Sequence, residues 1–195
     1  TGMKKCFAIL FLVLTLTICT FAAERPRWVS LPINVYIPEY GNMSRLMHQA
    51  FMSWQQQSRS LVRFKFVDSP ANANIEVEFV DFVANCNDVH AVGCTEMMTR
   101  GGQYYKAYVT IGTKQYKRTY ENGRLTRALV TRPKDNIYGV MLHEAGHAIG
   151  LGHSDSSNSI MYPYDLPTMQ YLTDEDMRLL YNKYHCLLYT SPSPR

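Results

Sequence analysis

Residues 143–153 constrain the fold of this chain more than any other segment. They follow the pattern H-E-x-x-H-x-x-G-x-x-H, in which three histidines, one glutamate and one glycine hold fixed positions. His143 and His147 lie four residues apart, so both rings leave the same face if the segment is a helix. Two neutral imidazoles placed in this way can bind one metal ion, and the spacing therefore predicts a helix that carries a metal site.

The other members of the pattern indicate a catalytic site rather than a closed structural one. Glu144 directly follows the first histidine, so it lies beside the metal and suits a general base that accepts a proton from water. Gly150 tolerates a positive φ and can end the helix, which lets His153 return to the same ion. Three protein ligands leave one coordination position open, as in catalytic zinc sites. The segment contains no thiolate donors, which disfavours iron–sulfur and Cys-rich sites.

A methionine downstream connects this segment to a known family. Met161 lies in Ser159-Ile160-Met161-Tyr162-Pro163, which resembles the Met-turn that packs beneath the imidazoles in metzincins. Ser154 follows the third histidine and is similar to the matrixin branch, whereas an acidic residue usually stands there in astacins. The chain therefore resembles a matrixin-like metzincin zinc metalloprotease of the minimal, bacterial type.

The resemblance extends over about residues 27–185. Trp28 with residues 31–38 is similar to the matrixin first strand, residues 51–54 to its first helix, and residues 172–176 to the start of its last helix. It implies an α/β (α+β) fold of the zincin type. In such a fold a five-stranded, twisted, mixed sheet with one antiparallel edge strand packs with three helices.

The resemblance also implies a function and assigns roles to residues. One catalytic Zn2+ would be held by His143, His147 and His153, and Glu144 would be the general base of a secreted endopeptidase. The residues that wall the substrate pocket just past the cleaved bond would be Tyr162, Pro163 and Tyr164. Calcium (Ca2+) ligands cannot be placed, and His90, the candidate for a second zinc, is better interpreted as a lone loop histidine.

Three other functions are compatible with the same residues. The first is an exported zinc-binding module that lacks protease activity. The second is a processing protease of narrow specificity rather than a broad degrading enzyme. The third is a zinc enzyme that acts on non-peptide amides. Glu144 argues against the first, and the residues do not separate the other two from a general endopeptidase.

Hydrophobic periodicity predicts the elements around the zinc segment. Alternation predicts strands at 33–37, 62–67 and 75–80, with Glu76 and Glu78 on a solvent face rather than paired for catalysis. Residues 44–57 are predicted to form a helix whose buried stripe is Leu46, Met47, Ala50, Phe51 and Trp54.

The second half of the chain is predicted in the same way. Residues 93–99 and 105–111 form a hairpin about Gly101-Gly102. Residues 112–132 are basic and polar without a clear period and are predicted to be a loop. The zinc helix runs from Asp135 or Asn136 to about Leu151. The final helix begins at a Thr173–Asp176 capping box, and its apolar face is Met177, Leu180, Tyr181 and Tyr184.

The free edge of the sheet is expected at about Cys94–Thr99. An extended peptide can add to such an edge as a further strand. Cys6, Cys19 and Cys186 lie in the two ends of the chain, which leaves Cys86 and Cys94 as an even pair in an exported protein. A disulfide between them would anchor this edge and stabilise the fold by about 2–3 kcal/mol. Two free thiols or metal ligands are the alternative.

The two ends of the chain are set apart from this domain. Residues 1–23 have the form of a signal peptide, with residues 1–2 read as upstream translation, so the protein is expected to be secreted, extracellular or periplasmic. A lipid anchor at Cys19 is disfavoured because Ile18 is the wrong size for a lipobox. Residues 186–195 resemble a translated sequencing adapter. Residues 24–185 would then form one catalytic domain.

The charge of residues 24–185 bears on possible partners. Seventeen basic and sixteen acidic residues leave this part nearly neutral. A neutral domain does not favour nucleic acid or an anionic membrane as a partner. The expected partner is a protein or peptide substrate, bound by a monomer.

Overall fold

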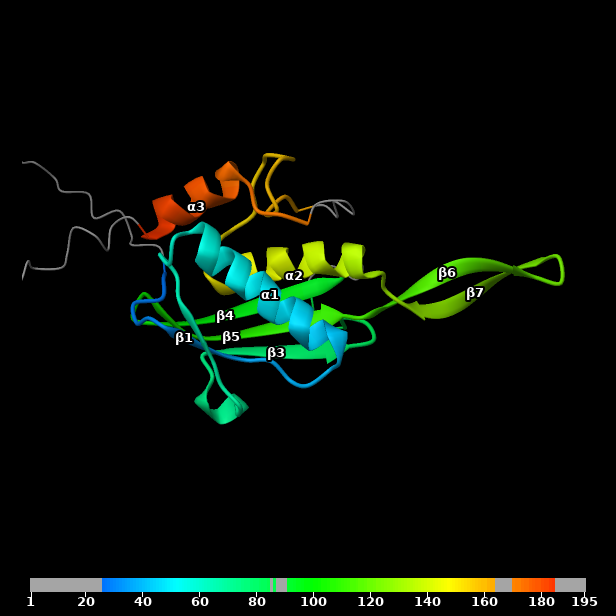
Figure 1. Ribbon diagram of the computed structural model, residues 1–195, viewed down its shortest axis with the longest axis horizontal. Coiled ribbons are helices and arrows are strands. Elements are labelled where there is room, and N and C mark those ends of the chain that lie inside the picture. Colours follow the sequence, from blue (N-terminus) through cyan, green and yellow to red (C-terminus); the bar gives the residue numbers. More distant parts are fainter. Residues whose placement is uncertain (1–25, 85, 87–90, 164–169, 185–195) are drawn as a thin grey trace, which may run out of the picture.

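The computed structural model describes residues 26–84, 86, 91–163 and 170–184. Within them a five-stranded sheet packs with three α-helices, and a two-stranded ribbon projects from one end of this body (Figure 1). The elements are β1 (Ile33–Tyr36), α1 (Asn42–Gln57), β2 (Phe64–Phe66), the 3-10 helix η1 (Pro70–Asn72), β3 (Ile75–Val80), β4 (Gly93–Arg100), β5 (Gln103–Gly112), β6 (Lys114–Glu121), β7 (Arg124–Thr131), α2 (Lys134–Ala148) and α3 (Asp174–Tyr184).

Several expectations fall outside the described residues. These are the signal peptide at 1–23, the adapter-like tail at 186–195, the lipid anchor at Cys19, the loop histidine His90 and the pocket residue Tyr164. Among the described residues, the helices are too short or too polar to cross a lipid bilayer.

The five-stranded sheet has the expected mixed topology. Its order is β2-β1-β3-β5-β4, and all neighbouring strands are parallel except β4, which runs antiparallel to β5. The turn between β4 and β5 places Gly101 and Gly102 at φ 57° and 75°. Two successive positive φ values are what a tight hairpin turn of this kind requires, and glycine adopts them without steric cost. The predicted fold class and the antiparallel edge strand are confirmed.

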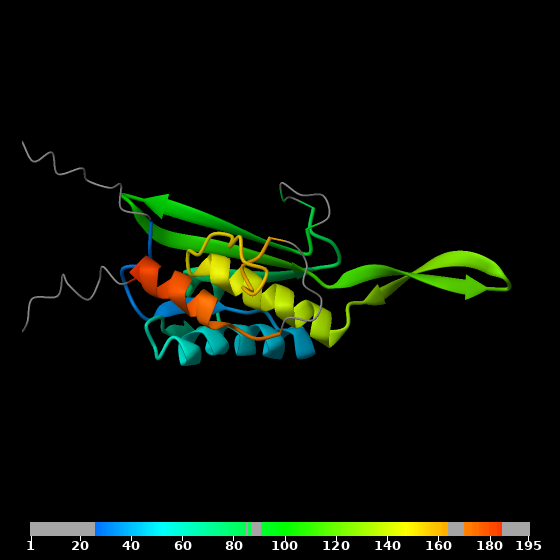
Figure 2. The same cartoon turned by 90° about the horizontal axis from the view of Figure 1, so that it is seen from above.

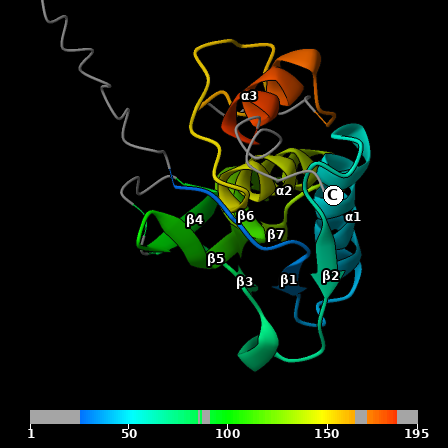
Figure 3. The same cartoon turned by 90° about the vertical axis from the view of Figure 1, so that its left-hand side faces the viewer.

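The core lies between one face of the sheet and the first two helices. Alternation along β1, β3 and β5 turns side chains such as Val35, Ile75 and Val109 toward the helices, where they are buried. The predicted stripe of α1 is buried against them. Figure 3 shows α1 and α2 on this face of the sheet and α3 beyond them. The Trp54 indole donates a hydrogen bond of 2.9 Å to the Leu142 carbonyl, which locks α1 to α2.

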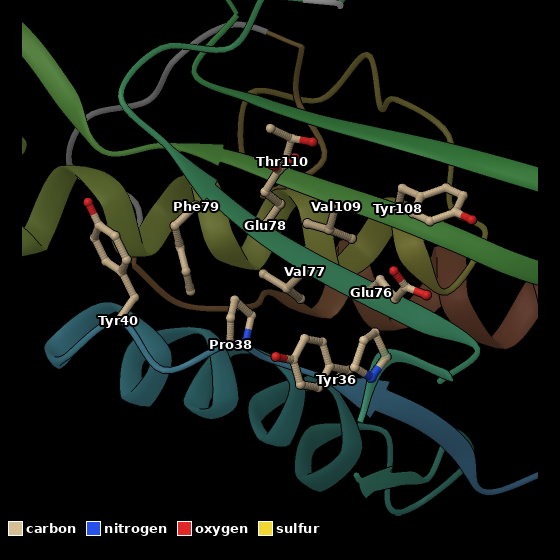
Figure 4. A pocket seen from close by; sticks show the side chains of 11 residues that line it. Tyr36, Pro38, Tyr40, Glu76, Val77, Glu78, Phe79, Tyr108, Val109 and Thr110 are labelled. Atoms are coloured by element: carbon tan, nitrogen blue, oxygen red, sulfur yellow. The ribbon is translucent and has the colours of Figure 1, made fainter. Parts of the chain in front are cut away.

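The opposite face of the sheet is open among the described residues. A cavity of about 440 Å³ lies there, and Figure 4 shows Tyr36, Glu76 and Tyr108 among the side chains around it. These residues alternate with buried core residues, so they lie on the face that does not meet α1 and α2. Glu76 forms an ion pair with Lys106, and Glu78 is exposed. The prediction that both glutamates lie on a solvent face is confirmed.

The prediction of a loop at residues 112–132 is wrong. β6 and β7 pair along their whole length as an antiparallel ribbon that extends far from the body (Figure 2). Their turn, Asn122-Gly123, has φ 50° and 76°, and this dipeptide is a strong hairpin signal. The two strands lack a simple apolar–polar alternation, because cations and aromatic residues share one face of the ribbon.

Candidate metal centre

The chain reverses direction at Gly150, directly after the end of α2. Gly150 has φ 91°, and its N–H donates to the His147 carbonyl at 2.7 Å. The Leu151 N–H donates to the Gly146 carbonyl at 3.0 Å, which completes the pair of bonds that closes a helix around a left-handed residue. α2 therefore ends at Ala148, before the expected Leu151, because the reversal at Gly150 uses the last carbonyls of the helix.

The three histidine rings converge on one point. The Nε2 of His147 lies 3.0 Å from the Nε2 of His143 and 3.2 Å from that of His153. The ligand atoms of the three side chains all lie within 4.8 Å of one another. Two nitrogens bound tetrahedrally to zinc at about 2.0–2.1 Å stand about 3.4 Å apart, so the observed spacing fits a shared zinc ion.

The other nitrogens of two rings are held by backbone carbonyls. Nδ1 of His143 lies 2.6 Å from the Ile160 oxygen, and Nδ1 of His147 lies 2.8 Å from the Leu151 oxygen. A carbonyl only accepts hydrogen bonds, so each Nδ1 carries the proton and each Nε2 presents its lone pair to the centre. Such outer partners fix the tautomer and orientation of metal-binding histidines.

The environment keeps the first two rings neutral. Burial, together with the neighbouring His143 ring, lowers the pKa of His147 to about 4, and burial also lowers the pKa of His143. Metal ions bind neutral imidazole and compete with protons for it. The pattern of donors, tautomers and protonation thus fits the zinc ion that the sequence predicts.

Glu144 is buried beside the histidines and against β4. Thr95 donates a hydrogen bond of 2.7 Å to its Oε2 and one of 3.2 Å to its backbone carbonyl. A Cβ at Gly93 would stand 2.5 Å from both Cγ and Oε1 of the glutamate, so this position leaves room only for glycine. Burial raises the pKa of Glu144 to about 7, partly offset by the Thr95 hydrogen bond. A carboxyl group in this range can accept and release a proton near neutral pH.

The turn at residues 159–161 packs under the centre. Met161 is fully buried, and a Cβ on Gly146 would overlap its Sδ. Gly146 therefore permits the methionine to pack directly against α2. The Met161 carbonyl accepts a hydrogen bond of 2.8 Å from the Ser154 N–H, which ties the turn to the segment after the third histidine.

A carboxylate on α3 holds the same turn in place. Asp176 is fully buried and accepts hydrogen bonds from Ser159 Oγ at 2.5 Å and from the Ile160 N–H at 3.2 Å. It also accepts bonds of 2.8 Å from both the N–H and the hydroxyl of Thr173. The predicted capping box is confirmed. Asp176 additionally supports the turn whose Ile160 carbonyl orients His143, a role that the sequence analysis missed.

The edge strand that contacts Glu144 also carries the cysteine pair. Cys86 and Cys94 form a disulfide with an S–S distance of 2.08 Å. Cys94 lies between Gly93 and Thr95 in β4, so the bond is attached to the strand that contacts the glutamate. Of the predicted pocket residues, Tyr162 is half-buried and Pro163 is exposed, and both directly follow Met161.

Thr95, Gly93, Gly146 and Asp176 were missed as site residues from the sequence. Thr95 and Gly93 stand about fifty positions before the glutamate that they contact, and only the packing of β4 on α2 brings them together. Asp176 gave a local signal as a helix cap, and nothing in that signal indicates the contact with Ser159.

Comparison with known proteins agrees with this geometry. The sequence model of the matrixin family matches residues 34–185. A protein of Trichoplusia ni ascovirus 2c that is named after the matrix metalloproteinases is 38% identical over 88 residues, which are 38% of this chain and 18% of that protein. The macrophage metalloelastase of Rattus norvegicus is 41% identical over 59 residues, or 29% of this chain and 12% of that protein.

A third relative gives a similar result. The matrix metalloproteinase-A of Caenorhabditis elegans is 40% identical over 42 residues, which are 22% of this chain and 8% of that protein. The chain thus spans less than a fifth of the length of each of these relatives. The family match, in contrast, covers most of the chain and runs through the histidine cluster, Met161 and α3. This chain belongs to the matrixin family.

Proposed function

We propose that this protein is a zinc-dependent endopeptidase that acts outside the cytoplasm. The observation that carries the proposal is the convergence of three imidazole Nε2 atoms beside a buried carboxyl group, next to a free sheet edge. Membership of the matrixin family supports the same activity. The apolar run after Lys4-Lys5 supports export from the cell.

The three histidines and Glu144 have different roles in the proposed reaction. His143, His147 and His153 would hold one zinc ion, which supplies a Lewis acid that lowers the pKa of water and polarises a carbonyl group. Glu144 accepts a proton at its carboxylate and returns it to the departing amine. Its pKa of about 7 makes both protonation states available at neutral pH. Burial excludes bulk water, so the proton passes between the glutamate and the reacting groups.

The substrate would bind along β4. Among the described residues this strand pairs with β5 on one side only, and the backbone groups of its other side can accept an extended peptide as a further strand. Thr95 and Gly93 of this strand contact Glu144, so a peptide added to β4 passes close to the base. Tyr162 and Pro163 follow the turn beneath the histidines, and we assign them to the pocket for the side chain after the cleaved bond.

Cleavage of a mixed peptide library, with and without a chelator, tests the proposal. The protein should create new internal termini. Activity should disappear on chelation and return with zinc, because the proposed reaction requires the metal ion that the three histidines would hold. Metal analysis should find one zinc ion per chain. Zinc binding without any cleavage would overturn the proposal in favour of a non-catalytic zinc module. Cleavage at one narrow sequence would identify a processing protease.

Thr95 should act as a positioning residue for Glu144. We expect Thr95→Val to lower kcat about tenfold with little change in KM, because it removes a hydrogen bond to a charged group that holds the base in place. The Thr95→Ser variant keeps the hydroxyl and should recover most of the loss. Steady-state kinetics on a fluorogenic peptide measure both constants.

A second threonine of β4 provides the matched control. Thr99 is exposed and is followed by the turn to β5, so Thr99→Val should leave kcat unchanged. A Thr95→Val enzyme with the parental kcat, or a serine variant as slow as the valine variant, would contradict the positioning role. Equal thermal midpoints of the variants would show that the kinetic change is not a folding defect.

A further inference from the structure

The β6–β7 ribbon presents one face of unusual composition. Its register places Tyr116 opposite Leu129 and Tyr120 opposite Leu125. The side chains of these four residues are 63%, 47%, 78% and 56% exposed, in the same order. Residues directly opposite each other, or two apart along a strand, share a face of the ribbon. The four large apolar side chains therefore lie together on one exposed surface.

Three cations lie on the same surface. Lys114, Arg118 and Arg127 alternate with the apolar residues along the two strands and complete what we call the ribbon face, made of Lys114, Tyr116, Arg118, Tyr120, Leu125, Arg127 and Leu129. Phe82 of the body stacks on Tyr116 at a ring distance of 5.4 Å and extends the apolar surface at its base. Soluble proteins rarely leave such a surface without a partner.

The arrangement of the cations indicates an anionic partner. Arg118 and Arg127 stand directly opposite each other, and like charges in this position destabilise a strand pair. The ion pairs found among the described residues, Lys106–Glu76 and Arg178–Glu175, lie elsewhere. A phosphate or similar group between two guanidinium groups would remove the repulsion and satisfy their donors.

The charge of the whole domain is unevenly distributed. Residues 114–131 hold five basic residues and one acidic residue, a formal charge of +4, whereas the rest of residues 24–185 holds twelve basic and fifteen acidic residues, or −3. The net charge of residues 24–185 is nearly zero, and for that reason no membrane partner was expected. That total is the sum of a cationic ribbon and an acidic body. An anionic surface would attract the ribbon and repel the body.

We propose that the ribbon face binds the surface of an anionic phospholipid bilayer. Tyrosines favour the headgroup level of a membrane, leucines can bury in the acyl boundary, and the arginine pair matches lipid phosphate. A sulfated polysaccharide or a nucleic acid would use the cations but leave Leu125 and Leu129 exposed to water. This proposal does not depend on the enzymatic activity.

The ribbon lies far enough from the histidine cluster to bind a membrane without covering it. β7 ends at Thr131 and α2 begins at Lys134, so the ribbon joins the body at the first turn of α2. His147 lies in the last turn of the same helix, about 20 Å along its axis at a rise of about 1.5 Å per residue. Figure 1 shows the ribbon projecting from the end of the body where α2 begins. A membrane-bound ribbon would therefore leave the histidine cluster accessible.

Vesicle co-sedimentation tests the proposal. The protein is mixed with vesicles of phosphatidylcholine, with or without phosphatidylserine, and the readout is the ratio of the two binding constants. The ratio is needed because the apolar run Phe7–Phe21 would bind both vesicle types. Arg118→Glu should lower this ratio about 25-fold, since it changes the charge at the surface by two units and each is worth about fivefold. High salt should lower it as well.

The choice of variants separates binding from folding. Arg118→Glu places opposite charges across the ribbon and should stabilise it, so a loss of binding cannot be attributed to unfolding. Lys65→Glu makes the same charge change at an exposed position of β2 and should leave the ratio nearly unchanged. Tyr120→Ser with Leu125→Ser should also lower this ratio, whereas Tyr181→Ser on α3 should leave it nearly unchanged.

Three results would overturn the proposal. One is no preference of the parent protein for phosphatidylserine vesicles. Another is equal loss of binding in Arg118→Glu and Lys65→Glu, which would indicate a non-specific charge effect. The third is tight binding to heparin that Arg118→Glu abolishes, without a preference for phosphatidylserine vesicles, which would assign the ribbon face to a sulfated polysaccharide instead.

Discussion

Replacing Glu144 by glutamine should lower kcat for peptide hydrolysis by about 10²- to 10⁴-fold, the usual contribution of a positioned general base. The amide oxygen can still accept the hydrogen bond from Thr95, so the side chain should keep its place beside the histidines. The glutamate contributes no atom to the histidine cluster, and zinc content should therefore stay at the parental level. Steady-state kinetics measure kcat, and metal analysis of the same samples measures the zinc content.

A glutamate on the same edge strand serves as the control. Glu96 is exposed in β4, and Glu96→Gln removes one carboxylate without changing Glu144. This variant should keep the parental kcat. A Glu144→Gln protein with normal turnover would exclude Glu144 as the base. Loss of zinc together with activity would instead show that the glutamate helps to build the metal centre.

Replacing Asp176 by alanine should lower the free energy of unfolding by about 3–5 kcal/mol, the range found when one partner of a buried charged network is removed. The substitution leaves the Ser159 hydroxyl and the N–H groups of Ile160 and Thr173 without their acceptor, at a site closed to solvent. The turn beneath the histidines should loosen, and zinc affinity should fall about 10- to 100-fold as the Ile160 carbonyl leaves His143. Denaturant titration and competitive metal binding measure the two effects.

The first turn of the same helix contains a suitable control. Asp174 is exposed, and Asp174→Ala should cost only about 0.3–1 kcal/mol through the helix dipole. The loss of stability in Asp176→Asn should fall between those of Asp174→Ala and Asp176→Ala. The amide keeps one acceptor oxygen, but its N–H₂ group faces other donors. An Asp176→Ala protein as stable as Asp174→Ala would refute the supporting role of the buried carboxylate.

Local patterns in the sequence were sufficient to predict most elements of the body. Alternation predicted β1 and β3, and the Gly101-Gly102 turn predicted β4 and β5 as a hairpin. The apolar stripe of α1 was buried as expected. The ribbon was the main failure. Its Asn122-Gly123 turn is a local hairpin signal. The strands on either side turn both cations and aromatic residues to one face, and neither face is buried in the core, so their sequences lack the apolar–polar alternation that predicts a strand.

The boundaries of the elements were less predictable for a physical reason. The end of α2 depends on the bonds around Gly150, and the carbonyls at that end are also taken by distant groups. The Trp28 indole donates to the Ala148 carbonyl at 2.8 Å, and the Tyr184 hydroxyl donates to the Ile149 carbonyl at 2.8 Å. Such partners satisfy the open end of a helix and come from elsewhere in the chain, so the local pattern does not reveal them.

The sequence by itself determined which side chains are the candidate metal donors of this protein. The rings of His143 and His147 share a face because a helix repeats every 3.6 residues, and Gly150 allows the reversal that returns His153. These are short-range consequences of backbone geometry. Only the tertiary structure decided what surrounds the donors: Thr95 on the glutamate, Met161 against Gly146, and Asp176 under the turn. Those contacts join elements far apart in the chain, and they depend on sheet register and helix packing rather than on local periodicity.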